Sequence, residues 1–230
     1  MAKFTFDKAS QRFRYKDGDR AGQYMSKAKA RGIVQDRITR EEKRIERIPI
    51  SLLNDDLTLA QWEASMAERI KTLHVQSYLL GKGGTHGYAP ARDGQVITPI
   101  IQEQYKYLRR FSEDIAAGKL SKAQIEQRAS LYASAAWQTR EHGKFISHRE
   151  SGYAWEQSVL DRGAENCALC EYFAYLKVVA IGVVSLRNPP GTRTCKAKCR
   201  CHMDYFVERP GGVKQSMMIQ LSPSLSLLSA

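Results

Sequence analysis

The sequence predicts a mainly α-helical protein with an antiparallel helical core, a small cysteine-rich α+β module and extended termini. Apolar residues recur at helical spacing from Leu59 to Ala136, all five cysteines fall between Cys167 and Cys201, and the last sixteen residues lack any periodicity. With 230 residues, 43% of them hydrophobic, the chain is long enough to bury one medium-sized core.

Residues 1–50 are predicted to be a basic N-terminal arm and helix. They hold fourteen Lys and Arg against seven Asp and Glu, so seven of the twelve net positive charges fall here. Aromatic residues surround an Asp17-Gly18 turn signal, which indicates a small hairpin or an extended arm. Ser26 to Arg47 then favours a polar helix that ends before Pro49. The excess charge suits nucleic acid or another acidic partner, although a solvated helix face is the simpler explanation.

Residues 51–150 are predicted to form the helical core. Thr58 and Gln61 make a capping-box pattern. Behind it follows an apolar stripe of Leu59, Trp62, Met66, Ile70, Leu73 and Leu80. The glycines at 81, 83 and 84 are expected to end this helix, because their order does not match a phosphate-binding loop.

Two further helices are expected in the same core. One opens at Thr98-Pro99 and closes at Gly118, since Pro is favoured in the first turn and Gly after the last. The next begins with a Ser121–Gln124 capping box and runs toward Gly143. The short connection between them predicts an antiparallel helical hairpin.

Residues 151–212 are predicted to be a cysteine-rich module, with short strands at 153–160 and 178–186 and a loop at 188–191. Residues 213–230 are read as an extended C-terminal tail that becomes ordered only on a partner.

The cysteines suggest a metal site. Cys167-Ala-Leu-Cys170 has the spacing of a metal-binding turn, in which two thiolates converge on one ion. The second half offers four more candidate ligands, Cys195, Cys199, Cys201 and His202. A tetrahedral zinc ion needs four of these six residues, and spacing leaves the choice in the second half open. If Cys199 and Cys201 lie in a strand, they share one face and bind together only where the chain is kinked.

Structural zinc is the preferred interpretation, and it makes the module a zinc-stapled one. Lys196, Lys198 and Arg200 alternate with the thiols and are expected to offset thiolate charge and lower cysteine pKa values. Free thiols or a disulfide are the alternative, and five cysteines would leave at least one unpaired. No general base, HExxH, GxSxG or GxGxxG pattern accompanies the cysteines, so we expect no catalysis.

The module resembles the C-terminal cysteine module of tailed-phage head morphogenesis proteins of the Mu F-like group. The resemblance rests on these segments: Trp155, Glu165-Asn-Cys-Ala-Leu-Cys170, Ile181-Gly182, Pro189-Pro-Gly191 and Cys199-Arg-Cys201-His202. Ala197-Lys198 stands where that family usually has Pro-His. The helices upstream look like those of phage proteins often encoded beside such head genes.

The resemblance implies a non-enzymatic minor capsid protein or head-to-tail connecting protein of a phage virion. An arm at each end suits assembly through the terminal extensions with capsid, portal or neck subunits, and we expect a homo-oligomer. The basic charge is compatible with contact with packaged DNA. The alternative function is a zinc-stabilised nucleic-acid-binding protein, whose binding would weaken steeply with salt.

We expect synthesis in the host cytoplasm and no membrane partner. Met1 to Lys16 is polar and charged, unlike a signal peptide. The longest apolar run, Val178 to Val184, is far shorter than the roughly 20 residues that span a bilayer.

Overall fold

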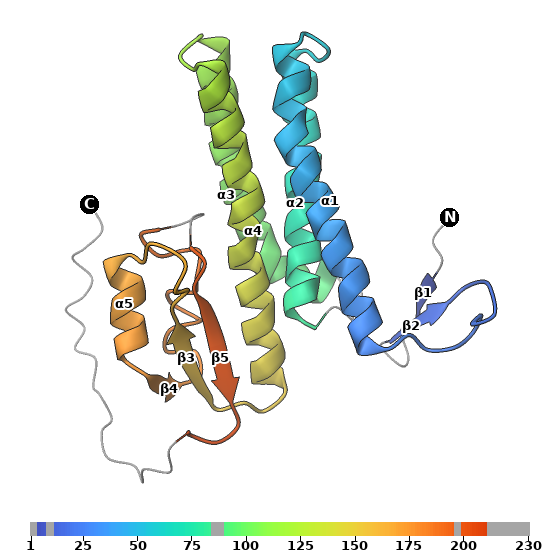
Figure 1. Cartoon of the computed structure of the whole chain (residues 1–230), viewed down its shortest axis with the longest axis vertical. Coiled ribbons are helices and arrows are strands. Elements are labelled where there is room, and N and C mark those ends of the chain that lie inside the picture. Colours follow the sequence, from blue (N-terminus) through green and yellow to red (C-terminus); the bar gives the residue numbers. More distant parts are fainter. Residues whose placement is uncertain (1–3, 8–11, 84–89, 196–198, 211–230) are drawn as a thin grey trace.

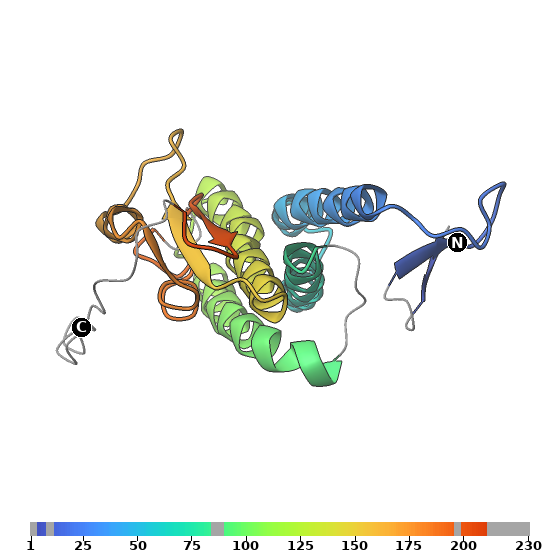
Figure 2. The same cartoon turned by 90° about the horizontal axis from the view of Figure 1, so that it is seen from below.

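Long helices dominate the computed structural model, which describes residues 4–7, 12–83, 90–195 and 199–210. Within these residues the protein is mainly helical, with a small sheet and a cysteine-rich C-terminal region. Figure 1 shows two helical hairpins side by side, α1 with α2 and α3 with α4, and the C-terminal module beside the end of α4. The N-terminal hairpin of β1 and β2 stands away from this body in Figures 1 and 2.

Helix α1 (Lys27–Leu53) is longer than its sequence predicts. The expected end before Pro49 is wrong, because Pro49 lies inside the helix and Asn54 caps it. A proline within a helix removes one hydrogen bond and crowds the preceding turn. Ile48, Leu52 and Leu53 nevertheless pack against the core around this point, and we attribute the continued helix to that burial.

Helix α2 (Leu59–Gly81) confirms its predicted cap and end. The Thr58 hydroxyl accepts from the Gln61 N–H and the Gln61 side chain accepts from the Thr58 N–H, which completes the capping box. The predicted stripe faces inward, with Trp62, Met66, Ile70 and Leu73 fully buried. Gly83, with φ of 97°, follows the last turn.

Helix α3 (Pro90–Ala116) begins earlier than predicted, and Pro99 lies within it instead of opening it. Ile97, on the N-terminal side of Pro99, is fully buried and packs with Tyr78 and Leu79 of α2, which gives this early turn a reason to be helical. Gly118, with φ of 64°, ends the segment as expected.

Helix α4 (Lys122–Glu150) has the predicted Ser121–Gln124 capping box but continues past Gly143. A Cβ atom at Gly143 would lie 2.3 Å from the Tyr78 carbonyl oxygen, and one at Gly81 would lie 2.1 Å from the Arg140 carbonyl oxygen. The two glycines therefore let α2 and α4 cross with their backbones in contact. Gly143 is a packing residue of this crossing and not a helix stop.

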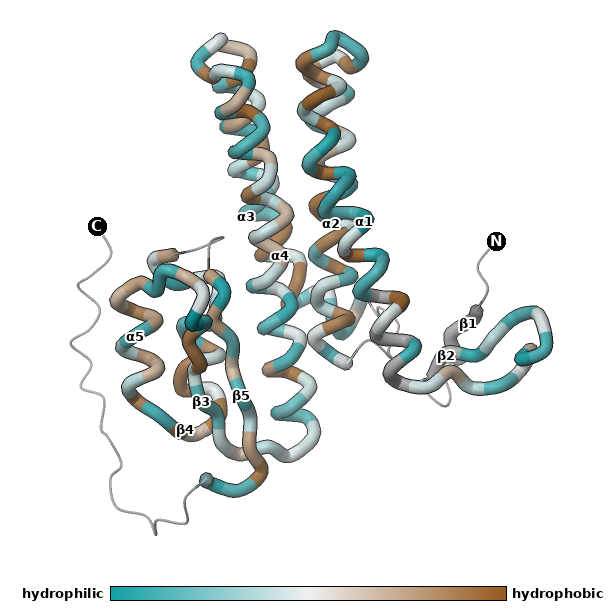
Figure 3. Tube along the Cα trace, viewed as in Figure 1, coloured by the Kyte–Doolittle hydropathy of each residue, from teal (hydrophilic) through white to brown (hydrophobic). Residues whose placement is uncertain are grey.

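All four helices contribute to the main core. Trp62 meets Phe111 edge to face at 5.2 Å between ring centroids, and Phe111 stacks on Tyr132 at 6.2 Å. The latter contact joins α3 to α4, and Arg128 binds Asp114 at 2.7 Å beside it, as the predicted hairpin requires. Figure 3 shows the apolar positions recurring between hydrophilic ones along the helices.

The C-terminal module contains an antiparallel sheet with strand order β4-β3-β5. Its strands are β3 (Trp155–Val159), β4 (Val178–Ala180) and β5 (His202–Phe206), and α5 (Ala168–Tyr175) lies between β3 and β4. Strand β4 is shorter than the predicted 178–186, because the chain turns at Ile181–Arg187. Helix α5 and strand β5 are absent from the sequence prediction. The expected loop at 188–191 is present.

The N-terminal segment forms a hairpin of β1 (Phe4–Asp7) and β2 (Arg12–Tyr15). The Asp17-Gly18 turn follows β2 and brings Tyr24 back to a bridge with Arg14. The predicted tail at 213–230 lies outside the described residues. No helix in the described ranges is both long and apolar enough to cross a membrane.

Candidate metal centre

The first pair of cysteines is positioned by the start of α5. Cys167 is the N-cap residue, and its side chain makes no capping hydrogen bond, which leaves the sulfur free to point elsewhere. Cys170 follows in the first helical turn and is fully buried. A CxxC sequence at a helix start therefore directs both sulfurs into one space, as the spacing predicts.

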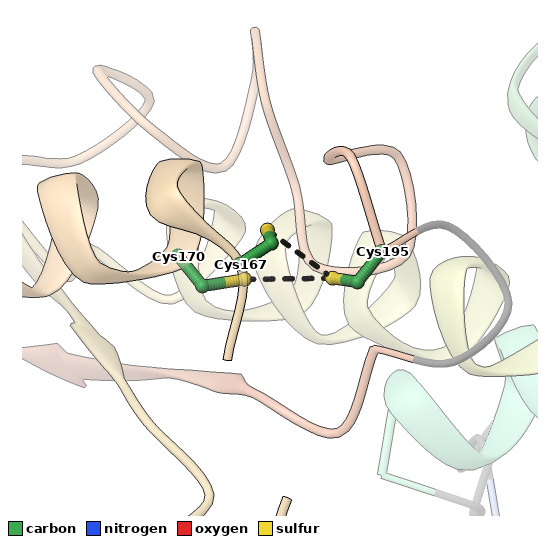
Figure 4. A group of neighbouring side chains, drawn as sticks. All are labelled: Cys167, Cys170 and Cys195. Carbon is green, nitrogen blue, oxygen red and sulfur yellow. Dashed lines mark hydrogen bonds between the residues drawn. The ribbon is translucent and has the colours of Figure 1, made fainter. Parts of the chain in front are cut away.

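The second half of the site comes from the loop before β5. Figure 4 shows the sulfurs of Cys167 and Cys170 directed toward the sulfur of Cys195. Both Sγ–Sγ distances to Cys195 are 3.6 Å, and the distance from Cys170 to Cys199 is 3.9 Å. Four sulfurs at about 2.3 Å from a tetrahedral zinc ion would lie about 3.8 Å from one another. The three Sγ–Sγ separations, Cys167–Cys195, Cys170–Cys195 and Cys170–Cys199, are thus compatible with a zinc-sized ion.

All five cysteines are free thiols in the structure. Their Sγ–Sγ distances of 3.6 and 3.9 Å are much longer than the disulfide bond length of about 2.05 Å, so these sulfurs are not bonded to one another. Candidate metal-binding groups in the described chain are Cys167 with Cys170 and Cys195, and Cys170 with Cys199 and Cys201. These cysteine clusters could hold a metal ion.

Cys201 and His202 have other neighbours. The Cys201 thiol donates to Asn166 Oδ1 at 3.2 Å. Its sulfur also lies within 4.8 Å of the sulfurs of Cys170 and Cys199. His202 lies in β5, and its Nε2 is 3.6 Å from Asp204 Oδ1. The structure therefore brings together the five predicted cysteines but not His202.

Cys199 and Cys201 precede strand β5 instead of lying within it. The expected restriction from strand alternation does not apply, because the backbone here is irregular. Both residues are buried, at 2% exposure each.

Burial dominates the acid–base properties of the inner thiols. It raises the pKa of Cys195 to about 12, and it also raises the pKa of Cys170, where the nearby Cys199 sulfur adds to the effect. Burial also acts to raise the pKa of Cys167. Hydrogen bonds from the Cys170 and Cys195 N–H groups outweigh it, however, and lower this pKa to about 7. The predicted general lowering of cysteine pKa values is wrong for Cys170 and Cys195.

A different cation from those predicted contacts the thiols. Arg200 is exposed and lines a cavity with Glu42 and Trp137 against the bundle. Lys196 and Lys198 lie outside the described residues. Arg193 instead is 1% exposed and donates from Nη1 to Cys170 Sγ at 3.6 Å. A single arginine in a loop has no sequence signal, so only the folded chain identifies it.

Hydrogen bonds fix the site to helix α4. Trp137 Nε1 donates to the Cys201 carbonyl at 2.9 Å, and the Met203 N–H donates to Glu141 Oε2 at 3.0 Å. Lys144 also donates to the Met203 carbonyl. The segment with Cys199 and Cys201 is therefore held between the bundle and the start of α5.

Comparisons with protein-family models, with curated proteins and with solved structures identify no match to this chain.

Proposed function

We propose that this chain is a non-enzymatic structural subunit of a tailed-phage head or neck, whose C-terminal module is held together by one zinc ion. The observation that supports this most is the convergence of the cysteine sulfurs around Cys170, which lies 3.6 Å from Cys195 and 3.9 Å from Cys199 between Sγ atoms. The phage assignment adds the resemblance of the same cysteine segments to the Mu F-like head proteins.

Zinc is favoured by the chemistry of the donors. Soft thiolates in a tetrahedral arrangement select zinc or iron–sulfur clusters over hard cations, and a structural zinc site takes four such ligands. With all four positions filled by sulfur, no position is left for a water or a substrate. This argues for a structural ion and against metal-dependent hydrolysis.

A structural ion suits the small size of the module's own core. That core contains the buried residues Phe145, Phe173, Val184, Met203 and Tyr205. An ion bound by α5 and by the loop before β5 would join the two ends of the module, and its binding energy would add to folding.

The exposed face of α5 supports a role in contacts with neighbouring subunits. Leu169, Tyr172 and Tyr175 are exposed at 39%, 45% and 81%, and they follow one another at three-residue spacing. Large exposed side chains of this kind are typical of interfaces.

Metal analysis of the purified full chain tests the zinc site. We expect one zinc ion per chain in the wild type and loss of the ion in Cys170→Ser. His202→Ala is the control, and we expect it to retain zinc, because the ring lies beside Asp204 and outside the cysteine cluster. A metal-free wild-type chain with intact folding would refute the zinc proposal.

Composition of purified particles tests the phage assignment. We expect the chain in density-purified virions at a fixed ratio to the major capsid protein, and as an oligomer by sedimentation. Absence from virions, together with DNA binding that weakens steeply with salt, would instead support the nucleic-acid-binding alternative.

A further inference from the structure

Arg193 is a buried cation at the candidate metal centre. Its Nη1 donates to Ser158 Oγ at 2.9 Å and to Cys170 Sγ at 3.6 Å, and its Nε donates to the Asn188 carbonyl at 3.1 Å. Its Nη2 lies 3.6 Å from Met203 Sδ. The Phe173 ring covers the guanidinium, with 5.0 Å from Cζ to the ring centroid.

Within the described part of the chain, no carboxylate forms an ion pair with this guanidinium. Among the described residues, the ion pairs formed by buried carboxylates are those of Glu41 and Asp93, and neither includes Arg193. A buried charge is costly unless an opposite charge accompanies it. The chain therefore needs an anion beside Arg193, and the thiol cluster is its neighbour.

A zinc ion bound by four thiolates would be such an anion. Four singly charged sulfurs around a doubly charged ion leave two net negative charges, which are themselves unfavourable in a buried site. The guanidinium and the metal–thiolate centre would each relieve the burial cost of the other.

We propose that Arg193 is the counter-charge of the metal centre and strengthens metal binding by offsetting its net negative charge and donating to Cys170 Sγ. This proposal rests on the proposed zinc site. Arg193 is a positioning residue, because it acts on a ligand and not on the ion. The planar guanidinium suits the role, since one group reaches Ser158, Asn188 and Cys170 at once.

Zinc affinity of three full-length variants tests the proposal, by competition with a chromophoric chelator. We expect Arg193→Gln to bind zinc about 10–100-fold more weakly, the usual effect of losing a group that supports a ligand. Arg193→Lys keeps the charge and should recover most of the affinity. Arg187→Gln removes an exposed arginine and should bind as the wild type does.

Thermal unfolding with zinc and with excess chelator separates charge compensation from simple packing. With zinc, Arg193→Gln should unfold at a lower temperature than the wild type. Without metal, the guanidinium has no anion beside it, so the same variant should be at least as stable as the wild type. A residue with only a packing role would destabilise both forms equally.

The outcomes distinguish the two proposals. A wild-type chain that binds no zinc overturns both. A wild type that binds zinc with the same affinity as Arg193→Gln overturns the role of Arg193 and leaves the zinc site standing. Unfolding of the variant in chelator, where the wild type stays folded, also overturns it.

Discussion

Acid should destabilise the helical bundle through His74. This side chain is fully buried, and its Nδ1 lies 2.5 Å from Thr139 Oγ1 across the α2–α4 contact. Burial lowers its pKa from 6.5 to about 4. The folded state thus keeps the ring neutral at a pH where the unfolded chain already takes up a proton.

The pKa difference sets both the direction and the size of the effect. Because the folded-state pKa lies below the unfolded one, the stabilisation is complete above about pH 6.5 and is lost as the pH falls toward about 4. Proton linkage gives a loss of about 2 kcal/mol in the free energy of unfolding between about pH 7.5 and about pH 5.

Urea unfolding of the wild type and His74→Gln at these two pH values measures the effect. Other groups titrate in both proteins, so the difference between their pH dependences isolates His74. Thr139→Val should keep the wild-type dependence, since burial and not the hydroxyl is the cause. Equal pH dependence in the wild type and His74→Gln would show that the reasoning about burial is mistaken.

Three further predictions concern packing and metal. Gly143→Ala should lower the free energy of unfolding by about 1–3 kcal/mol, because the new Cβ would collide with the Tyr78 carbonyl. Gly32→Ala should raise it by up to about 1 kcal/mol, because a Cβ there has no neighbouring atom within 4 Å. Chemical denaturation of the two variants measures both effects. Phe111→Ala should cost about 3–5 kcal/mol in the same assay, whereas Tyr172→Ala on the exposed face of α5 should change little. Chelation should remove hydrogen-exchange protection from β5 while α2 keeps it, because the bundle has its own apolar core; protection lost equally in both would contradict independent stabilisation.

Local signals predicted the parts of the fold that depend on neighbouring residues. The capping boxes at Thr58 and Ser121 involve residues three positions apart, so the sequence alone locates these helix starts. The prediction failed at Pro49, Pro99 and Gly143, where packing between helices outweighs a local preference against helix. Such packing joins segments far apart in the chain and leaves no local pattern.

The candidate site likewise combines features that the sequence predicts with features that only the fold determines. Cysteine chemistry and spacing are properties of the sequence, and they single out the five residues that the fold brings together. Which sulfurs lie at tetrahedral separation depends on how α5 and the loop before β5 are placed, and His202 is directed elsewhere by its position in β5. Arg193 becomes part of the site only through burial beside Cys170, because a charge acquires this role when the chain excludes water around it.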